Sequence, residues 1–376
     1  MKCKKNILIT GLTGNIGGVE SVVNNYVMSF PSDVRSNITF LFFGDKNKPF
    51  YRLVEEEKLK FVILPSIRSH PILHKKELGK FFKRYSSDFS VLWDNRSNLS
   101  NIECLKEAQK IGIKKRIIHC HNSRIQDKGI LGVARGVLHY LNRLKIKKYA
   151  NVFFTCNKNA DLWFFGKSVP DKEISFIPNS IKVEHYFFNE PCREKLRNRI
   201  NVTDGEILIG FVVRLSYQKN PIFAVKVLKK LERFGSKWKL VFIGGGEEIN
   251  RLKKEVLKER LFDKVIFIGP VTNANEWYSA IDILVMPSLF EGFPMSAVEA
   301  QVSGLPCVLS KTISGDVAIN DNVSFEDISS IDDPYKWAVL IRNLDLKRKS
   351  TIKFDQSIFN LNNSSTLFLN KLLRDK

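Results

Sequence analysis

The chain has 376 residues with 44% hydrophobic content, which is long enough for two α/β domains and apolar enough for large cores. Its formal net charge of +21 would suit nucleic acid, but the sequence has no zinc-finger spacing, no RNA-recognition motif and no disordered basic tail, so we expect no nucleic-acid partner. No apolar run approaches the roughly 18–20 residues of a membrane span, and the run after the basic N-terminus is too short for a signal peptide.

The first predicted element is a strand over residues 6–10, followed by a loop with four glycines, Gly11 to Gly18, and a helix over residues 19–28. The loop fits the Thr-Gly-x-x-Gly-x-x-Gly pattern of short-chain dehydrogenases, and Asp45 could bind a ribose. However, the Tyr-x-x-x-Lys pair of that family is absent, and a dehydrogenase would not explain the motifs of the second half. An oxidoreductase therefore remains only as an alternative.

A strand predicted over residues 116–120 leads into His121. His119 and His121 alternate onto the same face of this strand, which could indicate a metal site, but no distant partner ligand is evident. A histidine at a strand end can be structural or catalytic. Further along, Asn179 tolerates positive φ and could carry a turn.

Two loops of the second half follow predicted strands. Arg214 and Lys219 come after an apolar run over residues 207–213, and two cations at this spacing can clamp a diphosphate, although a basic loop can also be merely solvated. Gly244 to Gly246 and then Glu247 follow the next run. Three glycines allow close approach to a ligand, or simply form a flexible turn.

The most informative segment is residues 287–300, with the sequence PSLFEGFPMSAVEA. Glu291 and Glu299 flank a turn that contains Gly292 and Pro294, between a buried strand and a helix. Pro294 suits the first helical position. Free N–H groups at the start of a helix favour an anion, and the two carboxylates can hold hydroxyl groups, so the segment predicts a nucleotide-sugar site.

These motifs, in this order, make the chain resemble the retaining glycosyltransferases of family 4, which have the GT-B fold. Within that family it is most similar to enzymes of capsular and exopolysaccharide assembly. The resemblance rests on the Glu-x7-Glu pattern in its context, Pro-Ser-x-x-Glu-Gly-Phe-Pro, followed by Gly-Leu-Pro at residues 304–306. The sequence departs from the family in Val213 and Ser180, where the family commonly has glycine.

The resemblance implies an α/β fold with two Rossmann-like, doubly wound parallel-sheet domains that face a central cleft. Residues 1–185 would form the acceptor-binding domain and residues 186–353 the nucleotide-sugar donor-binding domain. A C-terminal helix over residues 354–376 would pack back on the N-terminal domain. Strand runs that alternate with helical patterns in both halves of the sequence agree with two such sheets.

The resemblance also implies roles for individual residues. His121 would contact the donor sugar near the reacting carbon, Glu291 would hold sugar hydroxyls, and Arg214 and Lys219 would stabilise the leaving diphosphate. The residues implied in donor binding are Gly17, Gly18, Gly246, Glu247, Val271, Gly292, Phe293, Pro294, Met295 and Glu299. Glu299 would bind the ribose.

The implied reaction transfers a hexosyl or N-acetylhexosaminyl unit, with retention, from a nucleotide-sugar such as a UDP-sugar to a glycan or lipid-linked oligosaccharide. The leaving phosphate would take the proton of the acceptor. No Asp-x-Asp occurs in the sequence, so we expect no metal and no other cofactor. A nucleotide-sugar epimerase on the same fold and a non-catalytic subunit of polysaccharide assembly remain alternatives.

The basic residues gather in the N-terminal half, where residues 1–185 have a net charge of +16 and the remainder has +5. Two helical patterns there combine cations with apolar residues, one over residues 75–84 and one over residues 131–148. Basic amphipathic helices favour an anionic membrane surface, whereas the alternative is core packing under a solvated face. The six cysteines are scattered, as in reduced cytosolic proteins. We therefore expect a cytoplasmic protein with a peripheral position at the inner face of the cell membrane.

Overall fold

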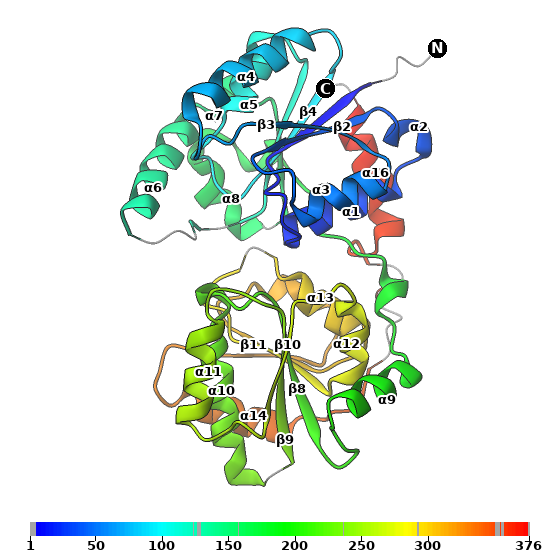
Figure 1. Cartoon of the computed structure of the whole chain (residues 1–376), viewed down its shortest axis with the longest axis vertical. Coiled ribbons are helices and arrows are strands. Elements are labelled where there is room, and N and C mark those ends of the chain that lie inside the picture. Colours follow the sequence, from blue (N-terminus) through cyan, green and yellow to red (C-terminus); the bar gives the residue numbers. More distant parts are fainter. Residues whose placement is uncertain are drawn as a thin grey trace. The chain divides into compact units, whose positions relative to one another are not determined.

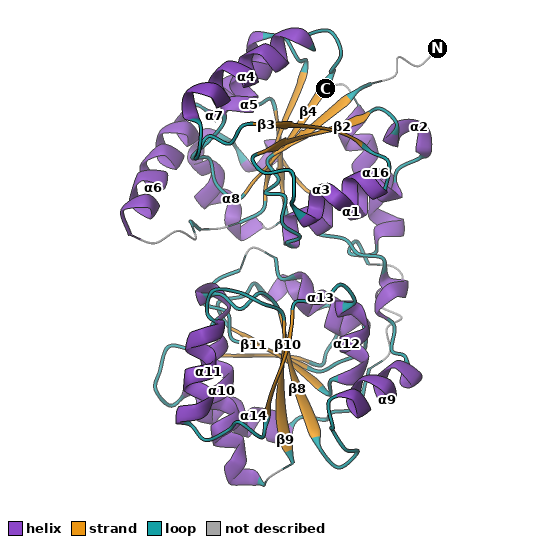
Figure 2. Cartoon of the chain, in the orientation of Figure 1, coloured by secondary structure: helices purple, strands orange, loops and turns teal. Residues whose placement is uncertain are grey.

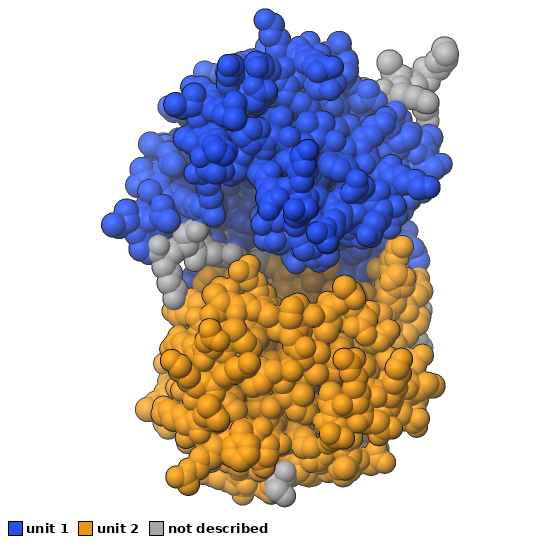
Figure 3. Space-filling view, viewed as in Figure 1, with its two compact units in different colours: residues 1–181, 361–376 blue, residues 182–360 orange. Residues whose placement is uncertain are grey.

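The computed structural model describes residues 5–122, 124–125, 129–156, 158–235, 237–291, 293–349, 354 and 357–374, with only the backbone at residues 158–160. The chain divides into two compact units, drawn in two colours in Figure 3. The N-terminal unit comprises residues 1–181 and 361–376, and the C-terminal unit comprises residues 182–360. These boundaries lie four residues before the predicted domain boundary and seven residues after the predicted start of the C-terminal segment.

The N-terminal unit is built on a sheet of seven parallel strands in the order β3-β2-β1-β4-β5-β6-β7. The strands are β1 (Ile7–Thr10), β2 (Ile38–Phe43), β3 (Lys60–Leu64), β4 (Val91–Arg96), β5 (Lys115–Cys120), β6 (Val152–Thr155) and β7 (Ile174–Phe176). Apolar runs such as β1, in which every residue is buried, are typical of parallel strands covered on both faces. The strand order reverses between β1 and β4, so a ligand crevice is expected at their carboxyl ends.

Helices surround this sheet (Figure 2). They are α1 (Gly18–Ser29), α2 (Ser32–Arg35), α3 (Pro49–Glu56), α4 (Pro71–Arg84), α5 (Glu103–Lys110), α6 (Gly129–Leu144), α7 (Ile146–Tyr149), α8 (Lys158–Phe165) and α16 (Leu361–Leu373). Helix α16 lies beside α1 (Figure 1), and the ring of Phe368 packs 4.4 Å from that of Tyr26 and 5.0 Å from that of Trp93. The last helix of the chain is therefore part of the N-terminal unit.

The C-terminal unit contains six parallel strands in the order β10-β9-β8-β11-β12-β13. They are β8 (Ile207–Val212), β9 (Trp238–Ile243), β10 (Val265–Gly269), β11 (Ile283–Met286), β12 (Cys307–Ser310) and β13 (Val323–Glu326). Its α-helices are α9 (Glu190–Arg199), α10 (Pro221–Leu231), α11 (Ile249–Lys258), α12 (Ala274–Ala280), α13 (Met295–Val302) and α14 (Asp333–Asn343). The order reverses between β8 and β11. The prediction of two Rossmann-like parallel sheets is confirmed.

Two local predictions are wrong. The φ of Asn179 is not positive, and the left-handed conformation occurs instead at Asn220, with φ 53° and ψ 52°, directly before α10. Pro294 is the N-cap of α13 rather than its first residue. For α4, the structure agrees with the core-packing alternative, because Phe81 and Phe82 are buried in the core.

No helix in the described residues is both long and apolar enough to cross a bilayer.

Candidate active site

Most of the predicted site residues of the C-terminal unit lie in loops at the carboxyl ends of four adjacent strands. Arg214 and Lys219 follow β8, Gly246 and Glu247 follow β9, Val271 follows β10, and Glu291, Phe293, Pro294 and Met295 follow β11. Gly292 lies outside the described residues. Because carboxyl ends of parallel strands share one edge of the sheet, residues nearly 80 positions apart in the sequence come together there.

The central contact of this edge is an ion pair between Lys219 and Glu291. Lys219 Nζ lies 2.6 Å from Glu291 Oε1, and the two side chains are only 17% and 6% exposed. Gln218 Nε2 donates to Glu291 Oε2 at 3.3 Å and to the carbonyl of Phe290 at 2.9 Å. The loop after β8 is thereby tied to the loop after β11, and both the cation and the carboxylate have a fixed position at the switch point of the sheet.

Backbone contacts hold the same two loops. The N–H of Leu289 donates to the carbonyl of Gln218 at 2.8 Å. Lys219 ends the short 3-10 helix Tyr217–Lys219, and the left-handed Asn220 then starts α10 with Pro221 at its first position. A proline there fits because its missing N–H is not needed in the first turn. The local sequence around Lys219 therefore sets the direction in which the Lys219 side chain extends from the backbone.

Arg214 forms a second and more open pair. Its Nη2 lies 3.0 Å from Glu247 Oε2, with side chains that are 72% and 55% exposed. Exposed ion pairs contribute at most about 1 kcal/mol, so the guanidinium can exchange Glu247 for a ligand phosphate at little cost. Arg214 and Lys219 thus supply two cations to one edge of the sheet, one exposed and one largely buried.

The glycines after β9 are required by the neighbouring loop. A Cβ on Gly244 would lie 2.2 Å from the carbonyl oxygen of Val213, and a Cβ on Gly246 would lie 2.2 Å from that of Leu215. Leu215 N–H donates to the carbonyl of Gly245 at 2.9 Å. In the described residues, these glycines are therefore needed because the loop after β9 packs closely against the loop after β8. The φ of Val213 is not positive, so the backbone at this position does not require a glycine.

Glu299 on α13 is held by a different set of side chains. Tyr186 Oη donates to its Oε1 at 3.2 Å, and Tyr278 Oη donates to its Oε2 at 2.6 Å. Burial raises the pKa of this carboxyl, while the two tyrosine hydroxyls act to lower it. Each carboxylate oxygen of Glu299 accepts one tyrosine hydroxyl, and these two hydrogen bonds fix the orientation of the carboxylate. Each oxygen keeps a lone pair that can accept a further hydrogen bond.

Phe293 and Met295 occupy the rest of the segment after β11. The ring of Phe293 is buried and stacks on Phe359, with centroids 4.9 Å apart and an interplanar angle of 19°. Met295 is half-buried at the first position of α13. Phe293 therefore anchors the start of α13 to the body of the unit.

His121 lies in the N-terminal unit, directly after β5. Its Nε2 is 2.9 Å from Asn95 Oδ1, at the end of the neighbouring strand β4, and its ring lies 4.1 Å from that of His119. Burial lowers the pKa of His121 to about 3. The ring is therefore neutral at physiological pH, and Nε2–H donates to Asn95. His119 is fully buried and accepts from Trp93 Nε1, so its role is structural.

The glycine loop of the N-terminal unit follows β1. Gly11 has φ +91°, and a Cβ there would lie 1.8 Å from the carbonyl oxygen of Asn95, so the loop passes directly over the end of β4. Glu20 on α1 accepts from the N–H and hydroxyl of Thr13, each at 2.8 Å, and thereby fixes the loop. Gly17 is the N-cap of α1, whereas nothing lies within 4 Å of a Cβ on Gly18. Gly18 leaves the start of α1 accessible.

Five residues that shape these sites were not predicted from the sequence: Asn95, Gln218, Tyr186, Tyr278 and Glu20. Gln218 could have been suspected, because it follows the predicted strand over residues 207–213, as Arg214 and Lys219 do. Asn95 lies near the end of β4, for which no strand was predicted. The two tyrosines belong to segments more than 20 residues from Glu299, and no short motif signals them.

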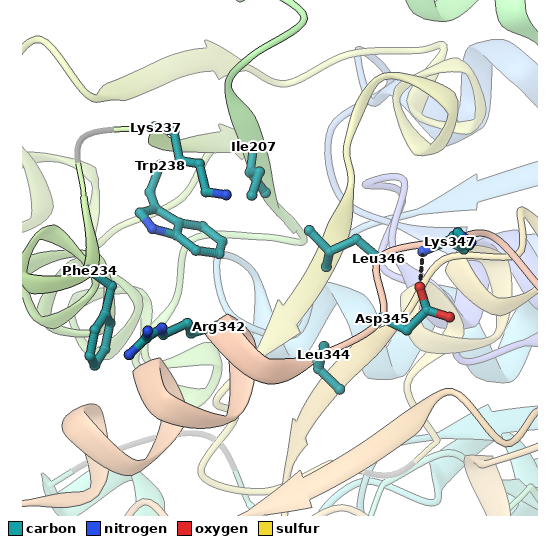
Figure 4. A pocket seen from close by; sticks show the side chains of 9 residues that line it. All are labelled: Ile207, Phe234, Lys237, Trp238, Arg342, Leu344, Asp345, Leu346 and Lys347. Atoms are coloured by element: carbon teal, nitrogen blue, oxygen red, sulfur yellow. Dashed lines mark hydrogen bonds between the residues drawn. The ribbon is translucent and has the colours of Figure 1, made fainter.

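In the described part of the chain, no three His, Cys, Asp or Glu side chains are grouped as they would be around a metal ion. A hollow of about 740 Å³ lies at the opposite edge of the C-terminal sheet, where β8 and β9 begin (Figure 4). It is lined by Ile207, Phe234, Lys237, Trp238, Arg342, Leu344, Asp345, Leu346 and Lys347. None of the predicted site residues reaches it.

We predict that His121 makes stability depend on acid pH. The unfolded side chain protonates near pH 6.5, whereas the folded one stays neutral down to about pH 3. The contribution of His121 is therefore present above pH 6.5 and is lost as the pH falls toward 3, by up to about 1.4 kcal/mol per pH unit. Denaturant unfolding of the wild type should show a steeper loss of stability in this range than His121→Asn. The exposed His185→Asn is the control, and equal slopes in wild type and His121→Asn would contradict the prediction.

Comparison with known proteins agrees with the fold. Residues 192–335 match the family Glycosyl transferases group 1. The chain is 28% identical over 306 residues to the putative glycosyltransferase EpsF of Bacillus subtilis. The aligned region covers 80% of this chain and 77% of EpsF. It is 27% identical to the Escherichia coli UDP-Gal:alpha-D-GlcNAc-diphosphoundecaprenol alpha-1,3-galactosyltransferase, over 59% of this chain and 63% of that enzyme.

A solved structure with the same architecture is that of Anabaena HepE in complex with UDP and glucose. It superposes with a TM-score of 0.79 at 16% identity, over 98% of this chain and 99% of HepE. The chain therefore has the GT-B fold. Arg214, Lys219, Glu247, Glu291 and Glu299 all lie within residues 192–335, the segment that matches the Glycosyl transferases group 1 family.

Proposed function

We propose that this protein is a retaining, metal-independent glycosyltransferase. It moves a hexosyl or N-acetylhexosaminyl unit from a nucleotide-sugar, a UDP-sugar in the first instance, to a glycan or lipid-linked oligosaccharide of a bacterial capsule or exopolysaccharide. The observation that carries the proposal is the Lys219–Glu291 ion pair of 2.6 Å at the switch point of the C-terminal sheet, between β8 and β11. It brings a cation for phosphate and a carboxylate for sugar hydroxyls to one point.

The donor would be held by groups of opposite character. Arg214 and Lys219 would balance the negative charge that grows on the diphosphate as the glycosidic bond breaks. The free N–H groups at the start of α13 would add to this charge balance. Glu291 would accept hydrogen bonds from the sugar, and Glu299 from the ribose. In the N-terminal unit, the accessible start of α1 at Gly18 would contribute further N–H donors.

The chemical step would need little acid–base chemistry from the protein. The acceptor hydroxyl attacks the anomeric carbon on the face from which the diphosphate leaves, and its proton passes to the departing phosphate oxygen. His121, which is neutral because burial lowers its pKa to about 3, would contribute a hydrogen bond near the reacting carbon rather than a charge. The protein would act mainly by positioning the reactants and stabilising charge.

Two similar proteins support the choice of substrates. HepE, which shares the fold, is bound to UDP and glucose in its crystal structure. The Escherichia coli relative is named as acting with UDP-Gal on a diphosphoundecaprenol-linked acceptor. We propose by analogy a UDP-sugar donor and a lipid-linked or glycan acceptor for this chain. Its Arg214 and Lys219 would provide the charge that a metal would otherwise supply.

The proposal is tested by incubating the purified protein with UDP-hexoses and lipid-linked or glycan acceptors. We expect a transferred sugar whose anomeric configuration, read by NMR, matches that of the donor, with full activity in EDTA. An inverted product would contradict retention, and activity that EDTA abolishes and Mg²⁺ restores would contradict metal independence. A C2-epimerised sugar formed without acceptor would indicate an epimerase.

We predict that Glu299→Ala weakens nucleotide binding more than it slows turnover. Without this carboxylate the nucleotide would lose one hydrogen-bond acceptor. This loss corresponds to a roughly 10- to 100-fold weaker affinity for the nucleotide. Calorimetric titration with UDP measures the affinity, and Glu259→Ala, a carboxylate at the end of α11, is the control. Unchanged affinity in Glu299→Ala would remove Glu299 from the site.

A further inference from the structure

Helix α6 of the N-terminal unit has its polar and apolar sides reversed relative to an ordinary surface helix, which packs its apolar side on the core. This helix, Gly129–Leu144, is 16 residues long, and among its described side chains only His139 is buried. It lies at the periphery of the unit (Figure 1). The side that contacts the protein is polar, and the side that faces away from it is apolar.

The inner side is fixed by hydrogen bonds. His139 Nδ1 accepts from the N–H of Leu99 at 3.0 Å, and its Nε2 lies 3.2 Å from the carbonyl of Trp163. Asn142 Nδ2 donates to the carbonyl of Leu99 at 2.7 Å, and Arg143 Nη1 donates to that of Trp163 at 3.0 Å. These contacts set the rotation of the helix, so its apolar side cannot turn inward without breaking them.

The outer side of α6 carries eight large apolar or aromatic side chains that are between 48% and 89% exposed. They are Ile130, Leu131, Val133, Val137, Leu138, Tyr140, Leu141 and Leu144. At 100° per residue, they cover half of the helix circumference without a polar residue between them. A continuous apolar face of this size on a folded protein marks a surface that binds an apolar partner.

The charges around this face identify the partner. Residues 128–160 contain no Asp or Glu, and three exposed lysines, Lys145, Lys147 and Lys148, follow directly after α6. Lys147 pairs with Glu173 at 2.8 Å, so one acid stands against three cations and the excess charge is positive. An apolar strip bordered by cations fits the boundary between acyl chains and anionic headgroups. A second copy of the chain would bring the same cations against each other, and this repulsion disfavours self-association through α6.

We propose that α6 is a membrane-docking element that lies in the plane of an anionic lipid surface, with its apolar side inserted among the acyl chains. Helix α4, the other basic helix of this unit, differs because its Phe81 and Phe82 are core residues. The docking surface is therefore the outer side of α6 together with the three lysines. All its residues belong to the N-terminal unit, and none is a candidate donor-site residue of the C-terminal unit, so docking can be tested with variants that leave those residues intact.

The test is flotation of the full-length protein with vesicles. With phosphatidylcholine vesicles that contain phosphatidylglycerol, we expect the protein to float, and with pure phosphatidylcholine vesicles binding should fall strongly. The variant Val133→Ser/Val137→Ser/Leu141→Ser should bind anionic vesicles at least about tenfold more weakly, because three inserted apolar side chains are lost. Lys145→Gln/Lys147→Gln/Lys148→Gln should weaken binding and reduce its dependence on salt.

Matched controls remove the same chemistry elsewhere. Leu257→Ser/Phe262→Ser/Ile331→Ser deletes three exposed apolar side chains of the C-terminal unit, and Lys253→Gln/Lys254→Gln/Lys258→Gln deletes three exposed lysines there. Both should bind vesicles like the wild type. The proposal is overturned if the wild type does not float, or if the α6 serine variant floats as well as its control. A third outcome would assign the apolar face of α6 to a second copy of the chain. In that case the wild type is a dimer, the serine variant is a monomer, and neither binds vesicles.

Discussion

Replacement of Lys219 by Ala is expected to lower kcat by roughly 10²-fold or more, because the variant loses a fixed cation beside the leaving diphosphate. The Nζ of this lysine lies 2.6 Å from Glu291 Oε1, in a pair that is largely shielded from water. Steady-state kinetics with the UDP-sugar donor would measure the effect, and KM should change less than kcat. Lys226→Ala, which removes an exposed lysine on the neighbouring helix α10, should leave both constants unchanged.

The same substitution leaves Glu291 as a buried carboxylate without its cation, which costs about 3–5 kcal/mol of stability in comparable buried pairs. Lost stability and lost catalysis can be separated by the double variant Lys219→Ala/Glu291→Gln. Its neutral amide needs no counter-charge, so thermal stability should recover while activity stays low. Wild-type kcat in Lys219→Ala, or recovery of activity in the double variant, would contradict the role of Lys219.

The second large effect is expected from Gly246→Ala. The added Cβ would lie 2.2 Å from the carbonyl oxygen and 2.7 Å from the carbonyl carbon of Leu215, so the two loops that carry Arg214 and Glu247 must separate. Overpacking against backbone costs about 3 kcal/mol, which corresponds to a melting temperature lowered by roughly 10 °C in a unit of this size. Nucleotide binding should be lost as well, since the loops shape the site.

The matched control for this substitution is Gly315→Ala. Gly315 lies in the same unit, its φ is not positive, and nothing lies within 4 Å of its Cβ position. Differential scanning calorimetry of both variants and titration with UDP give the comparison. A Gly246→Ala protein as stable as Gly315→Ala would mean that the loops after β8 and β9 are not packed as described.

Much of the fold could be predicted because buried parallel strands are unbroken apolar runs. The predicted strand over residues 6–10 is β1 to within one residue, and the predicted strand over residues 116–120 is β5 to within one residue. The positions of Arg214 and Lys219 after such a run followed from the same pattern. The boundary between the units was less well predicted, because the residues that end one unit and begin the next carry no periodic signal.

Contacts between distant segments could not be predicted in the same way. The hydrogen bond of Gln218 to Glu291 joins residues 73 positions apart, and that of Tyr186 to Glu299 joins residues 113 apart, so both depend on the strand order. The orientation of α6 is a further case. Its sequence is amphipathic, but periodicity alone does not tell which side faces the protein, and the hydrogen bonds of His139 decide it.

The measurement that tests the central claim most directly is a thermal-shift titration of the full chain with UDP, GDP, ADP, their sugars and NAD⁺, in parallel on the wild type and Lys219→Ala/Glu291→Gln. We predict that one nucleoside diphosphate and its sugars, with UDP expected, stabilise the wild type, and that the double variant responds much less. Stabilisation by NAD⁺ alone would assign the ligand to the glycine loop after β1, and an equal response of both proteins to UDP would remove the Lys219–Glu291 pair from the donor site.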